Sequence, residues 1–348
     1  MIWRISILLL LTTAACTSSN RHVDEIDLLM QRYDGAVPGA SLLVIRDGKP
    51  AIRKSWGLAD VEARISATPA TNYRLASVTK QFTAAAVLHL VQDEKIRLDD
   101  PVRQWLPTLP NAADSVTIGH LLTHTSGIVD YEDVMAPGTT MQLHDADVLR
   151  LLESQDTTYF KPGTSYRYSN SGYALLALIV ERASGKTFAT FLRDHIFTPL
   201  GMTNTVAFED GISTVPVRAF GYVMRNNGWT QRDQTSTSAV LGDGGIYSSI
   251  DDLAKWDAAL YDSRLLTDES RRLAFAPHTD TDEADVRYGF GWRITGETLW
   301  HSGETSGFRN VIVRYPARKI TVIILTNRNE PEPYRTALAI ADIYIRDR

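Results

Sequence analysis

Ala76-Ser77-Val78-Thr79-Lys80 opens an apolar segment that continues as Gln81-Phe82-Thr83-Ala84-Ala85-Ala86-Val87-Leu88. The segment predicts a helix to about Asp93, packed closely on all sides because few of its residues are bulky. Ser77 and Lys80 are three positions apart, so on a helix they lie roughly 60° apart and share a face. A serine hydroxyl is a weak nucleophile until its proton is removed, and an amine can remove it where a dry site disfavours the charged amine. The pair indicates acyl-serine chemistry, although a surface serine near a solvated lysine has the same spacing.

Length and composition describe an ordinary folded protein and exclude a nucleic-acid-binding one. The 348 residues are 44% hydrophobic, which is enough to bury one large core or two intertwined ones. The 36 basic and 41 acidic residues give a formal net charge of −5, so no basic excess would attract nucleic acid. Cys16 is the single cysteine, so the chain forms no internal disulfide. No motif implies a metal or an organic cofactor.

The first residues predict a lipoprotein-type export signal. Arg4 supplies a positive start, residues 5–11 an apolar run too short to span a bilayer, and residues 13–15 a small-residue cleavage site. Cys16 stands where a bacterial lipoprotein signal places its acylated cysteine, although Thr13 replaces a more usual aliphatic residue. The expected product is an exported periplasmic lipoprotein held at a membrane, preferably the outer one, through Cys16. Plain secretion is the alternative.

Strand patterns lie at both ends of the chain, and helical patterns lie between them. One sheet completed by the two ends, with a mostly helical insertion, would place a site at the seam between them. The expected division is a signal at 1–16, a tether at 17–23, a sheet-containing α/β domain at 24–97 and 286–348, and a helical insertion at 98–285. Expected strands cover 40–46, 51–58, 289–294, 298–301, 310–315 and 320–326, and expected helices cover 23–33, 118–122, 172–183, 188–196, 250–260 and 334–345.

Two further polar motifs fall on the two sides of the expected seam. Tyr168-Ser169-Asn170 precedes an apolar run, which predicts a loop leading into a helix. His301-Ser302-Gly303 follows a short strand and precedes a turn at Gly307. Taken singly, each residue has a structural interpretation: a tyrosine beside a helix, an N-cap asparagine and a strand histidine.

Taken in this order, Ser77-x-x-Lys80, Tyr168-x-Asn170 and His301-x-Gly303 resemble the penicillin-recognising serine hydrolases. The match is to the branch holding class C β-lactamases, D-alanyl-D-alanine carboxypeptidases, D-aminopeptidases and related esterases. The resemblance implies an α/β architecture of the α+β type, the β-lactamase/transpeptidase-like fold, with an antiparallel sheet flanked by helices. It extends from about Ile26 to the C-terminus and includes segments 120–127, 200–205, 244–249 and 288–292.

The resemblance also implies roles for individual residues. Ser77 would be the nucleophile, Lys80 would help to take its proton, and Tyr168 would be the second proton-transfer group. His301 would orient Tyr168 and the substrate. The resemblance also implies that Asn170, His301, Ser302 and Gly303 bind the substrate. The oxyanion hole would be formed by the backbone N–H groups of Ser77 and Glu304.

Two other hydrolytic chemistries are less well supported. His120 and His124 have the spacing of two zinc ligands on a helix, but Leu121 stands where a zinc protease needs its glutamate. The pair is therefore interpreted as a helix end leading into the turn at 125–127. The chain has no Gly-x-Ser-x-Gly elbow, which argues against an α/β-hydrolase.

Two residues favour peptidase or esterase activity over β-lactam hydrolysis. His301 replaces the lysine of typical class C β-lactamases, and Glu304 would place a carboxylate beside the substrate carboxylate, at a cost of roughly 1 to 4 kcal/mol. Arg309 would offset this repulsion if it pointed into the cleft. The expected substrate is a small molecule or a peptide, and peptides derived from peptidoglycan are included. D-amino-acid peptides or esters are expected in preference to β-lactams. The alternatives are a true β-lactamase and a non-catalytic cell-wall ligand-binding protein, which is disfavoured because no catalytic position is replaced.

Overall fold

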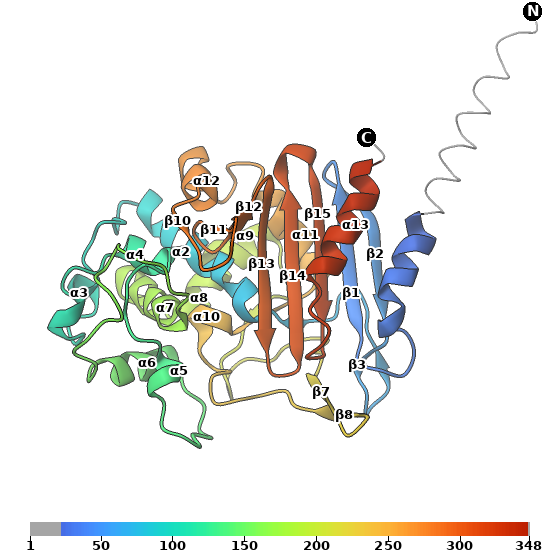
Figure 1. The fold of residues 1–348 in the computed structure, drawn as a ribbon, viewed down its shortest axis with the longest axis horizontal. Helices are drawn as coiled ribbons and strands as arrows, with labels where there is room; N and C mark the ends of the chain where they lie inside the picture. The colour runs from blue at the N-terminus through green and yellow to red at the C-terminus, as the bar shows by residue number, and fades with distance from the viewer. Residues whose placement is uncertain (1–21, 347–348) are drawn as a thin grey trace, which may run out of the picture.

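An antiparallel sheet of eight strands organises residues 22–346, the part of the chain that the computed structural model describes (Figure 1). The strand order is β10-β11-β12-β13-β14-β15-β1-β2, so strands from the two ends of the chain lie side by side. The prediction of one sheet completed by both chain ends is confirmed. The predicted signal, its Cys16 and the tether to residue 21 lie outside the described residues. The strands are β1 Ala40–Arg46, β2 Lys49–Trp56, β10 Thr279–Asp280, β11 Arg287–Tyr288, β12 Arg293–Thr295, β13 Thr298–Thr305, β14 Phe308–Tyr315 and β15 Ile320–Thr326.

One predicted strand is wrong. Residues 289–292 form a turn between β11 and β12, where the sequence predicted a single strand over 289–294. Gly291 has a φ of 75°, and a Cβ there would lie 2.6 Å from the carbonyl oxygen of Lys80. The turn therefore brings backbone against backbone at the start of the helix that begins at Lys80, which a regular strand would not do. The sheet also continues to β10, just before the predicted boundary at 286.

Alternating side chains bury both faces of the sheet. In β15, Ile320, Val322 and Ile324 enter one hydrophobic cluster with the closing helix α13 (Tyr334–Arg346). Ile323 enters the other cluster, on the side of α2 (Lys80–Gln92). This period of two is what a strand buried on both faces requires. Figure 1 shows α13 lying across the strands on the first face.

The helices gather mainly in the inserted region beside β10–β13 (Figure 1). Small strands interrupt them, so the insertion is mostly rather than wholly helical. Among the described residues, no helix is both long and apolar enough to cross a membrane. The remaining strands are β3 Leu58–Asp60, β4 Ile65–Ser66, β5 Tyr73–Arg74, β6 Val206–Ala207, β7 Tyr222–Arg225, β8 Gly228–Gln231 and β9 Ile246–Ser248; the remaining helices are a first helix at 22–30, α2 Lys80–Gln92, α3 Val102–Trp105, α4 Ile118–Leu122, α5 Tyr131–Val134, α6 Asp145–Leu152, α7 Asn170–Ser184, α8 Phe188–Leu192, α9 Thr198–Leu200, α10 Leu241–Gly244, α11 Ile250–Ala259 and α12 Asp268–Phe275.

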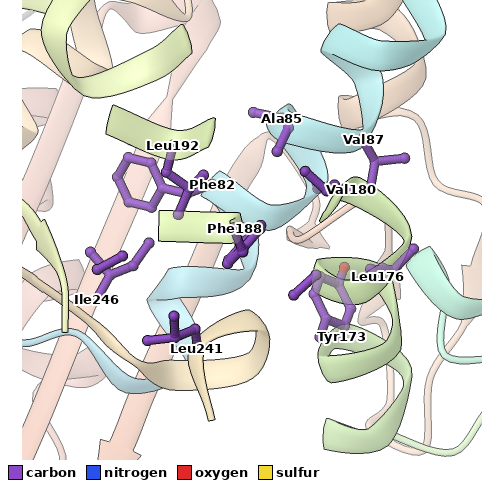
Figure 2. Packing of buried hydrophobic residues seen from close by; sticks show 14 of the residues in the cluster. Phe82, Ala85, Val87, Tyr173, Leu176, Val180, Phe188, Leu192, Leu241 and Ile246 are labelled. Atoms are coloured by element: carbon purple, nitrogen blue, oxygen red, sulfur yellow. The ribbon is translucent and has the colours of Figure 1, made fainter. Parts of the chain in front are cut away.

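Helix α2 is the buried axis of the molecule. Its residues from Lys80 to Leu88 are all buried, as the run of small side chains predicted. Figure 2 shows Phe82 of α2 near Phe188 and Leu192 of α8, with Tyr173 and its neighbours on α7 beside them. Each fully buried large apolar side chain contributes about 1.5–3 kcal/mol. This packing fixes the first turn of α2, and with it Lys80, rigidly against the insertion.

Candidate active site

Ser77 and Lys80 meet at the junction of a short turn and a helix. Ser77 lies in the 3₁₀ turn Ala76–Thr79, and α2 begins at Lys80. The Nζ atom of Lys80 donates a hydrogen bond to Ser77 Oγ over 3.1 Å. Ala76 has a φ of 50°, a left-handed conformation that costs a non-glycine residue about 1–2 kcal/mol. The strained residue turns the chain sharply just before Ser77, and strain of this kind is concentrated at functional sites.

Lys80 is fully buried, and its three donors all have acceptors. Besides Ser77 Oγ, Nζ donates to Asn170 Oδ1 over 2.9 Å and to the backbone oxygen of Asp243 over 3.0 Å. An ammonium group has three N–H bonds, so these contacts use all of them. None of the three acceptors is a carboxylate. The contacts come from the turn before α2, from α7 and from α10, so three elements aim the amine at Ser77.

Tyr168 places its ring, but not its hydroxyl, against Lys80. The Nζ atom of Lys80 lies 4.9 Å from the centroid of the Tyr168 ring. The Tyr168 hydroxyl is buried and has no hydrogen-bond partner among the described residues. Tyr168 stands just before α7, where Ser169 caps the helix by accepting from the backbone N–H of Gly172. The predicted loop leading into a helix is confirmed, and the N-cap is Ser169 rather than Asn170.

Asn170 uses both ends of its amide within the protein. Its Oδ1 accepts from Lys80, and its Nδ2 donates to Glu132 Oε1 over 3.0 Å. Its backbone N–H donates to Asp130 Oδ2 over 2.6 Å. The side chain is therefore held on the cleft wall in a single orientation.

His301 is a neutral, buried histidine in the middle of β13. Its Nδ1 lies 2.7 Å from the carbonyl oxygen of Ser302, which can only accept, so Nδ1 carries the proton. Its Nε2 then accepts from the Tyr288 hydroxyl over 3.0 Å. Burial and the nearby charges of Arg293 and Lys80 hold the pKa of His301 well below its ordinary value. The ring centroids of His301 and Tyr168 are 6.3 Å apart, and no hydrogen bond joins these two side chains among the described residues.

Gly303 brings β13 against the turn that carries Ser77. A Cβ at Gly303 would lie 2.1 Å from the carbonyl oxygen of Leu75, so only glycine permits this contact. The next residue, Glu304, lines the same cleft as Ser77. Its carboxylate, 65% exposed, forms an ion pair with Arg309 across the β13–β14 pair.

Three of the predicted residues, Ser77, Asn170 and Glu304, line one cleft between the sheet and the insertion. The other predicted residues, Lys80, Tyr168, His301, Ser302 and Gly303, are not part of this lining. The cavity volume of this cleft is about 60 Å³. Residues of the sheet and of the insertion both line this cleft, which supports the prediction that the site lies between them. The lining residues are Arg74, Ala76, Ser77, Tyr131, Glu132, Asn170, Thr237, Ser238, Asp243, Gly244, Glu304 and Thr305.

Asp145, which the sequence did not single out, holds α10 in place. Its buried carboxylate accepts the backbone N–H groups of Leu241 and Gly242, each over 2.9 Å. Burial raises the pKa of Asp145 to about 7. The next residue of α10, Asp243, supplies the carbonyl oxygen that receives Lys80. A single aspartate far away in the chain gives no sequence signal for this contact.

His124 holds the backbone on both sides of Tyr168. Its carbonyl oxygen accepts from Arg167 N–H over 3.0 Å, and its Nδ1 accepts from Ser169 N–H over 3.1 Å. The His124 and Tyr168 rings pack with centroids 4.3 Å apart. Burial, reinforced by the charge of Lys80, holds the pKa of His124 well below its ordinary value, so the ring is neutral. The prediction of a helix end before the turn is confirmed, because α4 ends at Leu122.

No zinc site accompanies these histidines. His120 caps its own helix through Nδ1, which accepts from the backbone N–H of Thr117 over 3.2 Å. Across residues 22–346, no group of three or more His, Cys, Asp or Glu side chains is placed to hold a metal ion.

Fold and site together define a serine hydrolase of the β-lactamase and penicillin-binding-protein type. The family model described as Beta-lactamase matches residues 24–345, and the chain belongs to this family. The fold is the β-lactamase/transpeptidase-like one that the resemblance implied.

Relatives of two kinds match over most of the chain. The chain is 31% identical to penicillin-binding protein 4* of Bacillus subtilis, over 88% of its own length and 71% of that protein. It is 30% identical to the D-aminopeptidase of Gluconobacter oxydans, over 93% of its own length and 62% of that protein. It therefore spans less than two thirds of the D-aminopeptidase.

Solved structures agree on the fold. The octameric penicillin-binding protein homologue from Pyrococcus abyssi superposes with a TM-score of 0.80 at 28% identity, over 93% of this chain and 77% of that one. A penicillin-binding protein from Bacillus halodurans gives a TM-score of 0.80 at 28% identity, over 91% of this chain and 98% of that one.

Proposed function

We propose that the protein hydrolyses a peptide, amide or ester through an acyl-enzyme on Ser77, and that it prefers D-amino-acid peptides or esters to β-lactams. The observation that carries the proposal is the 3.1 Å hydrogen bond between Lys80 Nζ and Ser77 Oγ, with the amine fixed by two further acceptors. The proposal is supported by relatives named penicillin-binding protein and D-aminopeptidase.

The proposed reaction has two halves. In the reacting form, Lys80 is a neutral amine that keeps its two N–H bonds for Asn170 and Asp243 and turns its lone pair to Ser77. It takes the proton of Ser77 Oγ while this oxygen attacks the substrate carbonyl carbon. The N–H groups of Ser77 and Glu304 stabilise the oxyanion, and Tyr168 protonates the leaving nitrogen or oxygen as its bond to carbon breaks. A water molecule then gives a proton to the Tyr168 oxygen and attacks the acyl carbon, and Lys80 returns its proton to Ser77 Oγ as the bond between this oxygen and the acyl carbon breaks. The acid is released, and Ser77, Lys80 and Tyr168 regain their starting forms.

Glu304 supports the preference against β-lactams. Its exposed carboxylate stands in the cleft, and its ion pair with Arg309 offsets only a share of its charge. A substrate that brings its own carboxylate to this place is disfavoured, whereas an ester or amide without one is not. Faster hydrolysis of nitrocefin than of p-nitrophenyl esters and D-amino-acid amides would instead establish a true β-lactamase.

A serine-directed probe tests the proposed chemistry without knowledge of the substrate. The purified protein is expected to be labelled by a fluorescent fluorophosphonate, and Ser77→Ala is expected to lose the label completely because the attacking oxygen is gone. In-gel fluorescence with an intact-mass measurement would locate one adduct per chain. Absence of labelling in the wild type would favour a non-catalytic ligand-binding protein on the same scaffold.

We further propose that the protein is exported and anchored to a membrane, preferably the outer one, through a lipid on Cys16. The support is the sequence itself: a positive start, an apolar run and small residues before the cysteine. Bacterial cells grown with an alkynyl palmitate analogue are expected to incorporate it into the wild type and not into Cys16→Ser. Equal incorporation into both proteins would rule out this anchor.

A further inference from the structure

Glu132 is a carboxylate on the cleft wall that the proposed chemistry does not use. It belongs to α5, lines the same cleft as Ser77, and accepts a hydrogen bond from Asn170 Nδ2 over 3.0 Å. It makes no ion pair with any described residue, whereas Glu304 of strand β13 is paired with Arg309. Glu132 is also exposed, so a ligand in the cleft can reach it.

Each of the other charged groups of the lining has at least one partner among the described residues, although Nε and Nη1 of Arg74 are buried without one. Arg74 donates to Gln234 Oε1 over 3.0 Å and is itself buried. Asp243 accepts from the Tyr131 hydroxyl over 3.0 Å, and burial raises the pKa of this carboxyl well above its ordinary value, which favours its neutral form. Among the carboxylates of the lining, Glu132 is therefore the exposed one that has no cationic partner among the described residues.

The hydrogen bond from Asn170 places Glu132 beside a residue that is expected to bind the substrate. The resemblance expects Asn170 to bind a substrate amide, but its Oδ1 is held by Lys80 and its Nδ2 by Glu132. A substrate carbonyl that takes Nδ2 must displace Glu132 from this hydrogen bond. The displaced carboxylate is left beside the substrate, which is unfavourable unless the substrate brings a positive charge to it.

We propose that Glu132 is a subsite for a free ammonium group, so that the enzyme selects amides and esters of amino acids or peptides with an unblocked amino terminus over their N-acylated forms. This inference rests on the proposed function, because it places the substrate carbonyl at Ser77. A substrate with a free α-amino group supplies a carbonyl for Ser77 and, on the adjacent carbon atom, a cation for Glu132. An N-acylated substrate supplies no cation.

Acid should weaken the selectivity. Although the side chain is exposed to the cleft, the surrounding walls partly desolvate its carboxylate, and this desolvation, followed by the charge of Asp130, raises the pKa of Glu132. A raised pKa means that the carboxylate gains its proton at a higher pH than an ordinary glutamate, so the preference is present above this pKa and lost as the pH falls through it. The titratable and charged groups that face Glu132 are Asp130 and Tyr131 beside it in the chain, Lys80 at the start of α2 and Asp243 of α10.

Protection of Ser77 from the fluorophosphonate tests the subsite without requiring turnover. D-alaninamide and N-acetyl-D-alaninamide are compared as competitors of labelling at neutral pH. In the wild type, D-alaninamide is expected to protect at an about 10- to 100-fold lower concentration, the usual range for a hydrogen bond to a charged group. Glu132→Gln, which keeps an acceptor for Asn170 and removes the charge, is expected to abolish this difference.

Asp133→Asn is the matched control, because it removes one carboxylate from the same helix outside the cleft lining. In Asp133→Asn, D-alaninamide is expected to protect Ser77 from labelling at a lower concentration than N-acetyl-D-alaninamide, by the same factor as in the wild type. Equal protection by the two amides in the wild type, no protection by either, or an undiminished preference in Glu132→Gln would each overturn the subsite while leaving Ser77 labelling intact. Loss of labelling in the wild type would instead overturn the proposed function, and the subsite with it.

Discussion

Replacing Lys80 by methionine is expected to slow the labelling of Ser77 by a fluorophosphonate by on the order of 10³-fold or more. The second-order rate constant of labelling measures this directly. Methionine matches the length and apolar stem of lysine but removes the amine, so Ser77 Oγ loses the group that takes its proton. The effect should be large because Lys80 Nζ is the donor to Ser77 Oγ and is aimed at it by two other acceptors.

Thr83→Val separates this effect from damage to the fold. Thr83 lies one turn further along α2, is fully buried, and donates to the carbonyl oxygen of Gly242 over 2.7 Å. Like Lys80→Met, it removes a hydrogen bond between α2 and α10 and costs stability, about 1–3 kcal/mol for the acceptor left unpaired. Thr83→Val should nevertheless keep labelling within a few fold of the wild type. Equal losses of rate in the two variants would mean that Lys80 acts on the position of α2 rather than on the proton of Ser77.

The catalytic pair could be predicted from the sequence because its geometry is local. Two residues three positions apart at a helix start meet whatever the rest of the chain does, and the structure places Lys80 Nζ 3.1 Å from Ser77 Oγ. Strands β1 and β15 were predicted with their observed limits for a similar reason. Both are mostly apolar runs, each with one polar residue inside it, Ser41 and Thr321, and each is ended by polar or turn residues.

What the sequence did not predict depends on contacts between distant segments. Asp243 assists Lys80 with a backbone oxygen, which has no residue type to recognise. Glu132 resembles any exposed glutamate on a short helix until Asn170 is placed beside it. The predicted strand over 289–294 failed at 289–292 because Gly291 approaches the backbone of Lys80 and Gly289 that of Ala274, which no local pattern records.

His124 is the clearest case of a residue whose type was noticed and whose contacts were not. Its spacing from His120 suggested zinc and then a helix end, but its ring and its carbonyl oxygen bind the chain on both sides of Tyr168. It also has a φ of 59°, so the fold accepts strain to put it there. These contacts make His124 a positioning residue for the ring that lies against Lys80.

His124→Leu is therefore expected to reduce hydrolysis according to the leaving group. The variant removes the acceptor for Ser169 N–H and the ring that packs on Tyr168, and a displacement of about 1 Å typically costs about 10²-fold in rate. The loss should fall on D-amino-acid anilides, whose leaving nitrogen needs the proton of Tyr168, and should be small on p-nitrophenyl esters, whose leaving oxygen does not. His124→Asn keeps an acceptor near the position of Nδ1 and should restore much of the anilide rate.

The ratio of kcat/KM for anilide and ester, measured on the wild type and the two variants, distinguishes positioning from general destabilisation. A variant that is merely less folded loses both activities equally, because the folded fraction scales every rate. Positioning of Tyr168 changes the ratio, since only one substrate depends on the proton. An unchanged ratio in His124→Leu, or a lack of rescue by His124→Asn, would show that His124 supports the fold and does not position Tyr168.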